Sequence, residues 1–344
     1  MFEINLITIQ VLIGLIFLSK FKQISNYINL FDYPDYKRKI HNKKISCIGG
    51  LFIFFNIIII LSCNFFLENT LISKNYFDRN IINFISFFLA LLIIFLMGLF
   101  DDIYVLKPNI KFLILILIIS CLVISDQDLV VSFLRFSFFD TVYDISKFSS
   151  FFSIFCIIVF INAFNMYDGS NLQASSISII IFTYILFLQK SIDLFSISLI
   201  ISLIFFSILN FKNKLFLGDN GSLILSFIIC YVFIKFYNKE LILYADQVCL
   251  FMLLPVIDLL RLFIVRARNG KSPFKPDKKH LHHILLEKFE QKIVMLILFS
   301  IYFFPVLFGV ITKEYLFFMI VQIILVLVLY IFLNGKSKKN VKSN

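Results

Sequence analysis

Tryptophan is absent from this 344-residue chain, and charged residues make up only 15% of it. The six cysteines are scattered and form no CxxC pair, so neither a disulfide framework nor a cysteine metal site is indicated. Histidine occurs only four times. The shortage of charge leaves no segment that could form a sizeable soluble domain, and the scattered cysteines argue against a disulfide-rich secreted protein.

Long apolar runs fill the chain instead, with 60% hydrophobic residues and a mean hydropathy of +0.95. Roughly 20 apolar residues cross a hydrocarbon core as one helix, which satisfies its own backbone polar groups. The sequence predicts an all-α polytopic membrane protein of about eleven transmembrane helices. We expect a single domain over 1–334, a short basic tail over 335–344, and spans at 3–19, 48–67, 81–100, 110–125, 150–166, 172–189, 193–211, 221–236, 246–265, 292–312 and 315–334.

Lysine and arginine are distributed unevenly between the loops that these spans define. Most of the 32 basic residues fall on the side that holds the loop before Gly49 and the tail after Asn334. By the positive-inside rule this side is cytoplasmic, which predicts an outside N-terminus and a cytoplasmic C-terminus. The net charge of +11 then reflects topology and contact with anionic lipid, and nucleic-acid binding is not expected.

Five polar motifs fall on this same side, although only lysine and arginine were used to define it. Their convergence predicts an active site at the cytoplasmic face. The motifs are Asp32-Tyr-Pro-Asp-Tyr-Lys-Arg38-Lys-Ile-His41 followed by Gly49-Gly50; Gly98-Leu-Phe-Asp101-Asp102; Asn162-Ala-Phe-Asn165-Met-Tyr-Asp168-Gly169; Phe216-Leu-Gly218-Asp219-Asn-Gly221-Ser222; and Ser272-Pro-Phe-Lys-Pro-Asp277-Lys-Lys-His280-Leu-His282-His283.

Acidic residues in two of the motifs suit a divalent cation. Asp101 and Asp102 follow each other at the C-terminal end of an expected helix, where the helix dipole disfavours negative charge. Mg²⁺ prefers carboxylate oxygens together with substrate phosphates, and Mn²⁺ would fit the same ligands. Asp219 opens another expected helix between glycines that let a backbone approach a phosphate. The simpler alternatives are a solvated acidic pair and an ordinary N-cap.

Asn162, Asn165 and Asp168 recur at a spacing of three, which places them near one face of a helix end. Such a polar stripe binds a sugar, a nucleotide or a metal, or it forms hydrogen bonds between helices. Asp258, inside an apolar span, is either functional or paired with Arg261.

The last motif gathers three histidines, His280, His282 and His283, near Arg266 and Arg268. A cationic cluster of this kind suits a diphosphate. A zinc site is the alternative, although no cysteine or HExxH pattern lies nearby.

In this order the five motifs resemble those of the polyprenyl-phosphate N-acetylhexosamine-1-phosphate transferases (glycosyltransferase family 4), which includes the undecaprenyl-phosphate N-acetylglucosamine-1-phosphate transferases. The resemblance covers about Asp32 to His283. The related peptidoglycan enzyme usually has three consecutive histidines, whereas Leu281 separates His280 from His282 here. This favours the branch of the family that initiates the synthesis of O-antigen, enterobacterial common antigen and teichoic acid. Two departures, Lys44 and Ser46 at usual proline positions and Ser170-Asn171-Leu172 where x-Asp-Gly or x-Asn-Gly is usual, leave the sugar open.

The resemblance implies a Mg²⁺-dependent enzyme of the bacterial inner membrane, with its active site on the cytoplasmic face. Undecaprenyl phosphate would attack the β-phosphate of a UDP-N-acetylhexosamine and give undecaprenyl-diphospho-sugar and UMP. A direct attack and a covalent aspartyl intermediate both fit the residues of the five motifs. It implies metal binding by Asp219 and Asp102 and catalysis by Asp101, Asp102 and Asp168, and it is compatible with a homo-oligomer. The substrate-binding residues would be Asn162, Asn165, His280, His282, His283, Arg266, Arg268, His41, Arg38 and Lys111.

Three other functions fit a polytopic chain. A transporter or flippase of lipid-linked sugars would need polar groups near the midplane and on both faces, whereas the motifs gather on one. A lipid-phosphate phosphatase would release phosphate without a nucleotide sugar. An inactive scaffold would tolerate loss of Asp219.

Overall fold

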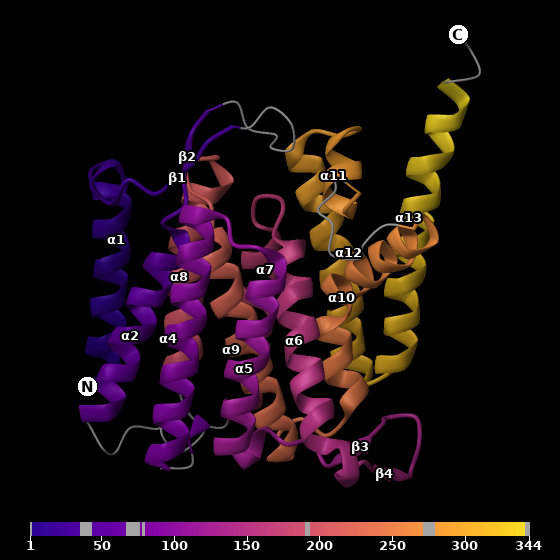
Figure 1. Cartoon of the computed structure of the whole chain (residues 1–344), viewed down its shortest axis with the longest axis horizontal. Helices are drawn as coiled ribbons and strands as arrows, with labels where there is room; N and C mark the ends of the chain where they lie inside the picture. Colours follow the sequence, from indigo (N-terminus) through magenta and orange to yellow (C-terminus); the bar gives the residue numbers. More distant parts are fainter. Residues whose placement is uncertain are drawn as a thin grey trace.

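The computed structural model describes residues 2–34, 43–66, 76–77, 80–189, 193–270 and 279–340. Helices run side by side through most of these residues (Figure 1). They are α1 (Phe2–Ile28), α2 (Gly49–Phe66), α4 (Ile81–Tyr104), α5 (Pro108–Ser125), α6 (Ser149–Tyr167), α7 (Gln173–Leu188), α8 (Leu194–Phe211), α9 (Gly218–Asn238), α10 (Ala245–Arg268), α11 (Leu281–Leu286), α12 (Gln291–Thr312) and α13 (Tyr315–Asn340).

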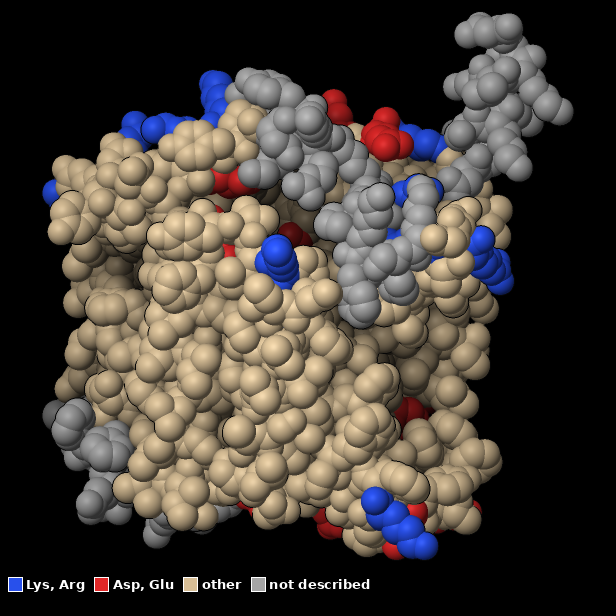
Figure 2. Space-filling model, viewed as in Figure 1, with Lys and Arg blue, Asp and Glu red and all other residues tan. Residues whose placement is uncertain are grey.

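Nine of the described helices are long and apolar enough to cross a membrane, and α2 and α7 are shorter apolar helices. Each of the eleven expected spans coincides with one of these helices, so the prediction of a polytopic α-helical membrane protein is confirmed. The number of crossings and the orientation remain predictions. The described part of the chain also forms a broad surface band almost free of charge between two charged ends (Figure 2).

Local sequence signals set several helix starts. The Asn80 side chain accepts a hydrogen bond from the Ile82 N–H at 2.9 Å and caps α4. Pro108 occupies the first position of α5, where no backbone donor is needed. Asp193 caps α8 by accepting the Phe195 N–H at 3.2 Å. Pro255 lies inside α10 without ending it.

Two small antiparallel sheets lie at opposite ends of the bundle (Figure 1). Strands β1 (Phe31–Asp32) and β2 (Ile45–Ser46) lie at the same end of the bundle as α11. Strands β3 (Phe133–Arg135) and β4 (Val142–Asp144) form a hairpin between α5 and α6, flanked by the 3₁₀ helices η1 (Gln127–Leu129) and η2 (Ser146–Phe148).

Helix α9 is the centre of the bundle. It packs against α2, α4 and α6, and nearly all of its side chains are buried. Its apolar side chains, such as Phe227 and Phe233, lie in the core. Because these contacts fix α9 along its length, they also fix the polar residues at its two ends.

The chain begins at one end of the bundle and α13 extends beyond the other (Figure 1). Helix α1 is 27 residues long and continues to Ile28, past its expected end at residue 19. At 1.5 Å per residue it measures about 40 Å, more than a hydrocarbon core requires. Helix α13 likewise continues to Asn340, into the segment expected as a tail, and residues 341–344 lie outside the described part.

Candidate active site

A cavity of about 1920 Å³ opens at the end of the bundle that holds β1, β2 and α11. It exceeds the roughly 300–1,000 Å³ of common ligand pockets, so it has room for two substrates. Figure 2 shows acidic atoms in a recess at this end. Eleven of the predicted site residues line it, namely Asp101, Asp102, Lys111, Asn162, Asn165, Asp168, Asp219, Arg266, His280, His282 and His283.

Glycines bring three helices together below the cavity. A Cβ atom on Gly50 would lie 1.8 Å from Asn220 Oδ1, and one on Gly98 would lie 2.4 Å from Asn220 Cα. A Cβ on Gly221 would lie 2.8 Å from Gly50 Cα. Helices α2 and α4 therefore approach the start of α9 at distances that only glycine allows. This packing role differs from the phosphate approach expected for Gly221.

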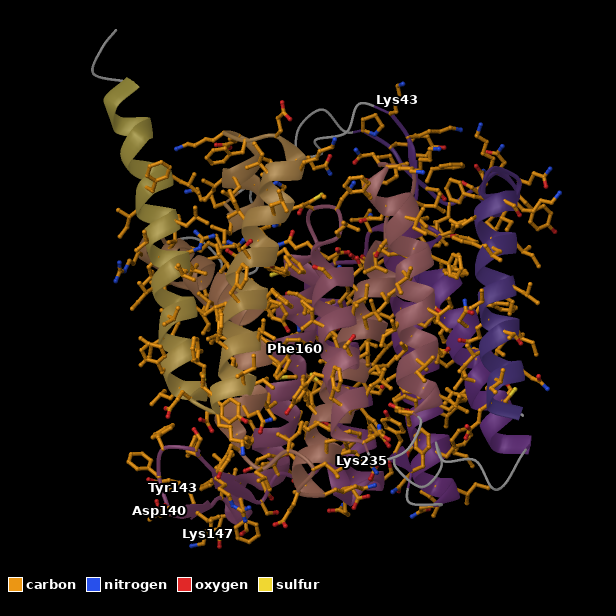
Figure 3. The ribbon with its side chains drawn as sticks, turned by 180° about the vertical axis from the view of Figure 1, so that it is seen from behind. Lys43, Asp140, Tyr143, Lys147, Phe160 and Lys235 are labelled. Atoms are coloured by element: carbon orange, nitrogen blue, oxygen red, sulfur yellow. The ribbon has the colours of Figure 1, made fainter. Side chains whose placement is uncertain are left out.

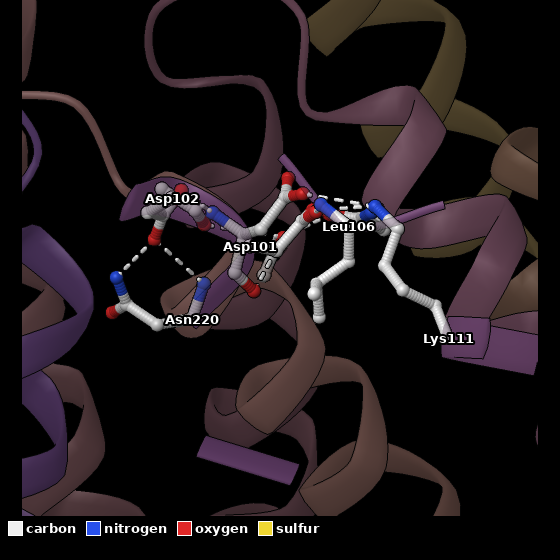
Figure 4. A network of polar contacts seen from close by, with 9 residues as sticks. Asp101, Asp102, Leu106, Lys111 and Asn220 are labelled. Atoms are coloured by element: carbon white, nitrogen blue, oxygen red, sulfur yellow. Dashed lines mark hydrogen bonds and ion pairs between the residues drawn. The ribbon is translucent and has the colours of Figure 1, made fainter. Parts of the chain in front are cut away.

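Asp102 caps the start of α9 from the end of α4 (Figure 4). Its Oδ1 accepts the Asp219 N–H at 2.8 Å, and its Oδ2 accepts the Asn220 N–H at 3.1 Å and the Asn220 side-chain amide. These bonds satisfy donors that a helix start leaves without partners. Asp102 thus orients Asp219, and its remaining lone pairs stay available to a cation. The sequence suggested neither this cap nor the part played by Asn220.

Lys111 joins Asp101 to Asp219. Its ammonium group contacts Asp101 Oδ2 and lies 3.3 Å from Asp219 Oδ2. The Leu106 N–H also donates to Asp101 Oδ1 at 2.6 Å (Figure 4). The Asp101 side chain is only 5% exposed, whereas that of Asp219 is 35% exposed. Asp219 is therefore the acid of this pair that a ligand can reach.

The donor set at this point suits Mg²⁺. Within the described residues, the network holds the carboxylates of Asp101, Asp102 and Asp219 and one ammonium group, which contacts the first and the last of them. No three His, Cys, Asp or Glu side chains among those residues are grouped closely enough to hold a metal by themselves. Mg²⁺ commonly takes one or two carboxylates and completes its shell with water and substrate phosphates. Among the described residues, His280, His282 and His283 form no group that could hold a metal ion.

The three polar residues at the end of α6, Asn162, Asn165 and Asp168, have different surroundings. The Asn162 amide donates to Ile158 O at 2.8 Å within its own helix, and Asn165 Oδ1 accepts a hydrogen bond from the Ser222 hydroxyl of α9. Asp168 directly follows the helix. Burial and the nearby charge of Asp102 raise its pKa to about 7, although a hydrogen bond from the Ala174 N–H acts in the opposite direction. A carboxyl with this pKa can accept or release a proton near neutral pH.

Asp258 holds the histidine segment against α10. Its Oδ2 lies 2.8 Å from His280 Nδ1, and its Oδ1 accepts the Leu281 N–H at 3.1 Å and Arg261 Nη2 at 2.8 Å. The buried acid inside an apolar helix is thus paired with Arg261 and also positions the cavity wall. The sequence offered these two roles as alternatives.

His282 bridges this wall to the end of α6. A Cβ atom on Gly169 would lie 1.9 Å from His282 Nε2, so only glycine leaves room for the ring. The His282 and His283 rings are 4.2 Å apart between centroids. The pKa of His282 is lowered well below 6.5, mainly by burial and to a smaller extent by the neighbouring His283 and His280. His282 is therefore neutral at pH 7 and adds no positive charge to the cluster expected there.

The unusual segment after Gly169 braces the loop that precedes α9. The Asn171 amide donates to Asn210 O at 2.5 Å and to Asn213 Oδ1 at 2.7 Å. The Leu172 N–H donates to Asn210 Oδ1 at 2.6 Å. Leu172 has φ +61°, a left-handed conformation that glycine adopts more easily. The second glycine missing from the motif thus falls at a position whose backbone would favour it.

Three predicted residues are not part of this site as described. Arg268 is exposed at the end of α10 and does not line the cavity. Arg38 and His41 lie outside the described residues.

Comparison with known proteins places the chain beside several relatives of similar length. The model of the family described as glycosyl transferase family 4 matches residues 84–237, which include Asp101, Asp102, Asp168 and Asp219. A probable undecaprenyl-phosphate N-acetylglucosaminyl 1-phosphate transferase of Bacillus subtilis (strain 168) is 24% identical over 338 residues, 96% of this chain and 88% of that protein.

Two further relatives are named undecaprenyl-phosphate alpha-N-acetylglucosaminyl 1-phosphate transferase. The protein of Thermotoga maritima is 28% identical over 300 residues, 86% of each chain. That of Yersinia pestis is 24% identical over 286 residues, 80% of this chain and 74% of the relative.

Proposed function

The chain belongs to glycosyl transferase family 4, and from this premise we propose that it transfers an N-acetylhexosamine-1-phosphate from a UDP-sugar to undecaprenyl phosphate. The products are undecaprenyl-diphospho-sugar and UMP. The observation that carries the proposal is that one large cavity is lined both by Asp101, Asp102 and Asp219 and by Arg266 and the three described histidines. Phosphoryl transfer depends on such positioning and charge neutralisation.

The reaction exchanges one phosphorus–oxygen bond for another. An oxygen of the lipid phosphate attacks the β-phosphorus of the UDP-sugar, and the bond from that phosphorus to the bridging oxygen of UMP breaks. The attacking oxygen must be unprotonated, and Asp168 has a pKa near 7 that suits it to take up the proton.

The other residues hold the donor. Asp102 keeps Asp219 at the start of α9. The Lys111 ammonium group lies 3.3 Å from the Asp219 carboxylate and would contact a phosphate oxygen bound beside it. Mg²⁺ held by Asp219, with the open lone pairs of Asp102, would neutralise the diphosphate and the leaving UMP. Arg266, His280 and His283 also line the cavity, and the neutral His282 ring is a hydrogen-bonding group without charge.

The site's position at one end of an apolar bundle suits a reaction between a soluble nucleotide and a lipid phosphate. The bias of basic residues toward this end supports a cytoplasmic location in a bacterial inner membrane. The product would begin a cell-surface polysaccharide such as an O-antigen. The relatives' names favour N-acetylglucosamine as the sugar.

Release of UMP by purified protein tests the proposal. The assay contains undecaprenyl phosphate, Mg²⁺ and UDP-N-acetylglucosamine, and we expect UMP only when all three are present. Asp219→Asn should abolish it, whereas Asp144→Asn, an exposed acid at the other end, should not. If folded protein releases no UMP with any of a panel of UDP-amino sugars, the proposal is wrong. Phosphate release without a nucleotide sugar would indicate a phosphatase instead.

A further inference from the structure

The connection between α5 and α6 is an ordered structure at the end of the bundle opposite the cavity (Figure 1). It contains the hairpin of β3 and β4, in which Leu134 pairs with Tyr143 and Arg135 pairs with Val142. Nothing in the proposed reaction uses this segment. Because α5 and α6 are both long enough to span a membrane, the hairpin lies at the level where these helices leave it.

Side chains from α9 and α10 hold the hairpin in place. The Tyr237 hydroxyl accepts the Arg135 N–H at 2.9 Å and donates to Phe133 O at 3.0 Å. Asp246 accepts both the N–H of Ser137, at 3.0 Å, and its hydroxyl. The hairpin is therefore fixed to two helices of the bundle, and the side chains at its tip have a defined direction.

The tip carries a cluster of aromatic side chains. The Phe136 ring lies 5.5 Å from that of Phe138 and 5.9 Å from that of Tyr143, and the rings of Phe138 and Phe139 are 4.6 Å apart. Phe138, Phe139 and Tyr143 are 43%, 54% and 45% exposed. Exposed aromatic area of this size is unfavourable in water, so a partner is expected to cover it.

The first turns of α6 extend this apolar surface. Phe148, Phe151 and Phe155 are strongly exposed and recur at spacings of three and four, so they share one face of the helix start. A membrane-spanning helix presents such a face to lipid. Polar residues of the same segment, Asp140 and Lys147, lie with Tyr143 at this end of the molecule (Figure 3). Aromatic side chains beside polar ones are typical of the membrane–water interface.

We propose that the hairpin tip, residues 136–143, is a membrane-interface anchor. Phe138, Phe139 and Tyr143 insert at the boundary between headgroups and acyl chains in the leaflet opposite the cavity. The chain contains no tryptophan, so phenylalanine and tyrosine supply the whole aromatic belt. Through Tyr237 and Asp246, the anchor sets the depth of α9 and α10 in the bilayer.

The absence of tryptophan makes the test direct, since any introduced indole is the only one present. A Phe139→Trp variant is reconstituted into phosphatidylcholine vesicles that contain lipids brominated either near the headgroup or near the chain terminus. We expect strong fluorescence quenching by the shallow label, weaker quenching by the deep label, and protection from aqueous acrylamide. Tyr143→Trp repeats the measurement should Phe139→Trp fold poorly.

Two positions of α6 calibrate the result. Phe155→Trp, on the lipid-facing side and further along the helix, should be quenched more by the deep label than Phe139→Trp. Phe160→Trp, at a buried position within the bundle, should be quenched by neither (Figure 3).

Two results would overturn the proposal. Quenching of the hairpin reporters by acrylamide but not by brominated lipid would show a tip in water. Protection from both quenchers would show that protein covers the tip, and a lipid-to-protein titration would identify a second copy of the chain.

Discussion

The two ends of α9 bury charge in opposite ways. Near its C-terminal end Lys235 is completely buried (Figure 3), with Nζ 2.9 Å from Asp126 Oδ2 and 3.0 Å from Asp128 Oδ2. The Tyr231 hydroxyl donates to Asp126 at 3.0 Å and completes a compact network. At the N-terminal end Asp219 faces a cavity. A closed ion pair holds helices in register, whereas an open acidic cluster retains capacity for a charged ligand.

Unsatisfied polar atoms add to the difference. Asn220 Oδ1 and His282 Nδ1 at the cavity end are buried without a hydrogen-bond partner within the described structure. Buried polar atoms without a partner are rare in proteins, and a bound ligand, water or ion commonly accounts for them. Left-handed backbone, by contrast, occurs at both ends: Val105 and Leu172 beside the cavity have φ of +54° and +61°, and Glu240, just after the C-terminal end of α9, has φ of +56°.

The largest expected effect is at the open end. Asp219→Asn keeps the size of the side chain but removes the charge that the cavity offers to a cation. We expect UMP release to fall by a factor of about a thousand, roughly 4 kcal/mol of transition-state stabilisation. The thermal midpoint should change little because the side chain is partly exposed.

Asp102→Ala provides the contrast within the same network. It removes the acceptor for the first N–H groups of α9, so both activity and thermal midpoint should fall. Equal loss of thermal stability in both variants would mean that Asp219 has a structural role as well.

The next effect is at the closed end. Lys235→Met leaves two carboxylates near each other without a cation, one of them fully buried, and should lower the free energy of unfolding by about 3 kcal/mol. UMP release per folded molecule should be unchanged, because the network lies at the end opposite the cavity (Figure 3). Chemical denaturation in detergent and the UMP assay measure the two quantities.

A second substitution distinguishes charge from packing at this end. Adding Asp126→Asn to Lys235→Met removes the buried uncompensated charge and should recover part of the stability. If the double variant is no more stable than the single one, packing rather than charge dominates at Lys235.

The sequence predicted the helices well because apolar runs of sufficient length have few other structures in a membrane. Boundaries were less certain: α9 begins at Gly218 rather than at residue 221, which places Asp219 in its first turn. The hairpin of β3 and β4 was not foreseen, since its exposed aromatic residues resemble those of the neighbouring helices.

The site was predicted as a set of residues but not as an arrangement. The motifs identified Asp101, Asp102 and Asp219, yet adjacent acids in a sequence do not reveal that one caps a distant helix and the other binds a lysine. The pairing of Asp258 with His280 joins residues 22 positions apart. Such contacts depend on how α4, α9 and α10 pack, which periodicity does not encode.

A third effect depends on pH. The pKa of His282 in the folded protein lies well below 6.5, its ordinary value. Between these two pKa values the unfolded chain binds more protons, so the free energy of unfolding falls as the pH drops below about 6.5. The slope is at most about 1.4 kcal/mol per pH unit for one group.

His282→Gln should flatten this dependence. The thermal midpoint of the unmodified protein is compared with that of the variant between about pH 7.5 and 5.5. The variant should lose less stability on acidification, whatever its midpoint at neutral pH. Parallel curves would mean that His282 remains able to take up a proton when folded.

The smallest effect concerns strain at the cavity end. Val105 ends α4 three residues after Asp102 in a left-handed conformation, and its side chain is 79% exposed. A β-branched residue is strained there and buries little surface in return, so Val105→Gly should raise the free energy of unfolding by about 1 kcal/mol. Val142→Gly, in an extended strand of the hairpin, should lower it by about 0.5–1 kcal/mol. Opposite signs would show that the left-handed φ of Val105 stores strain, and a loss of stability in both would show that this φ costs nothing.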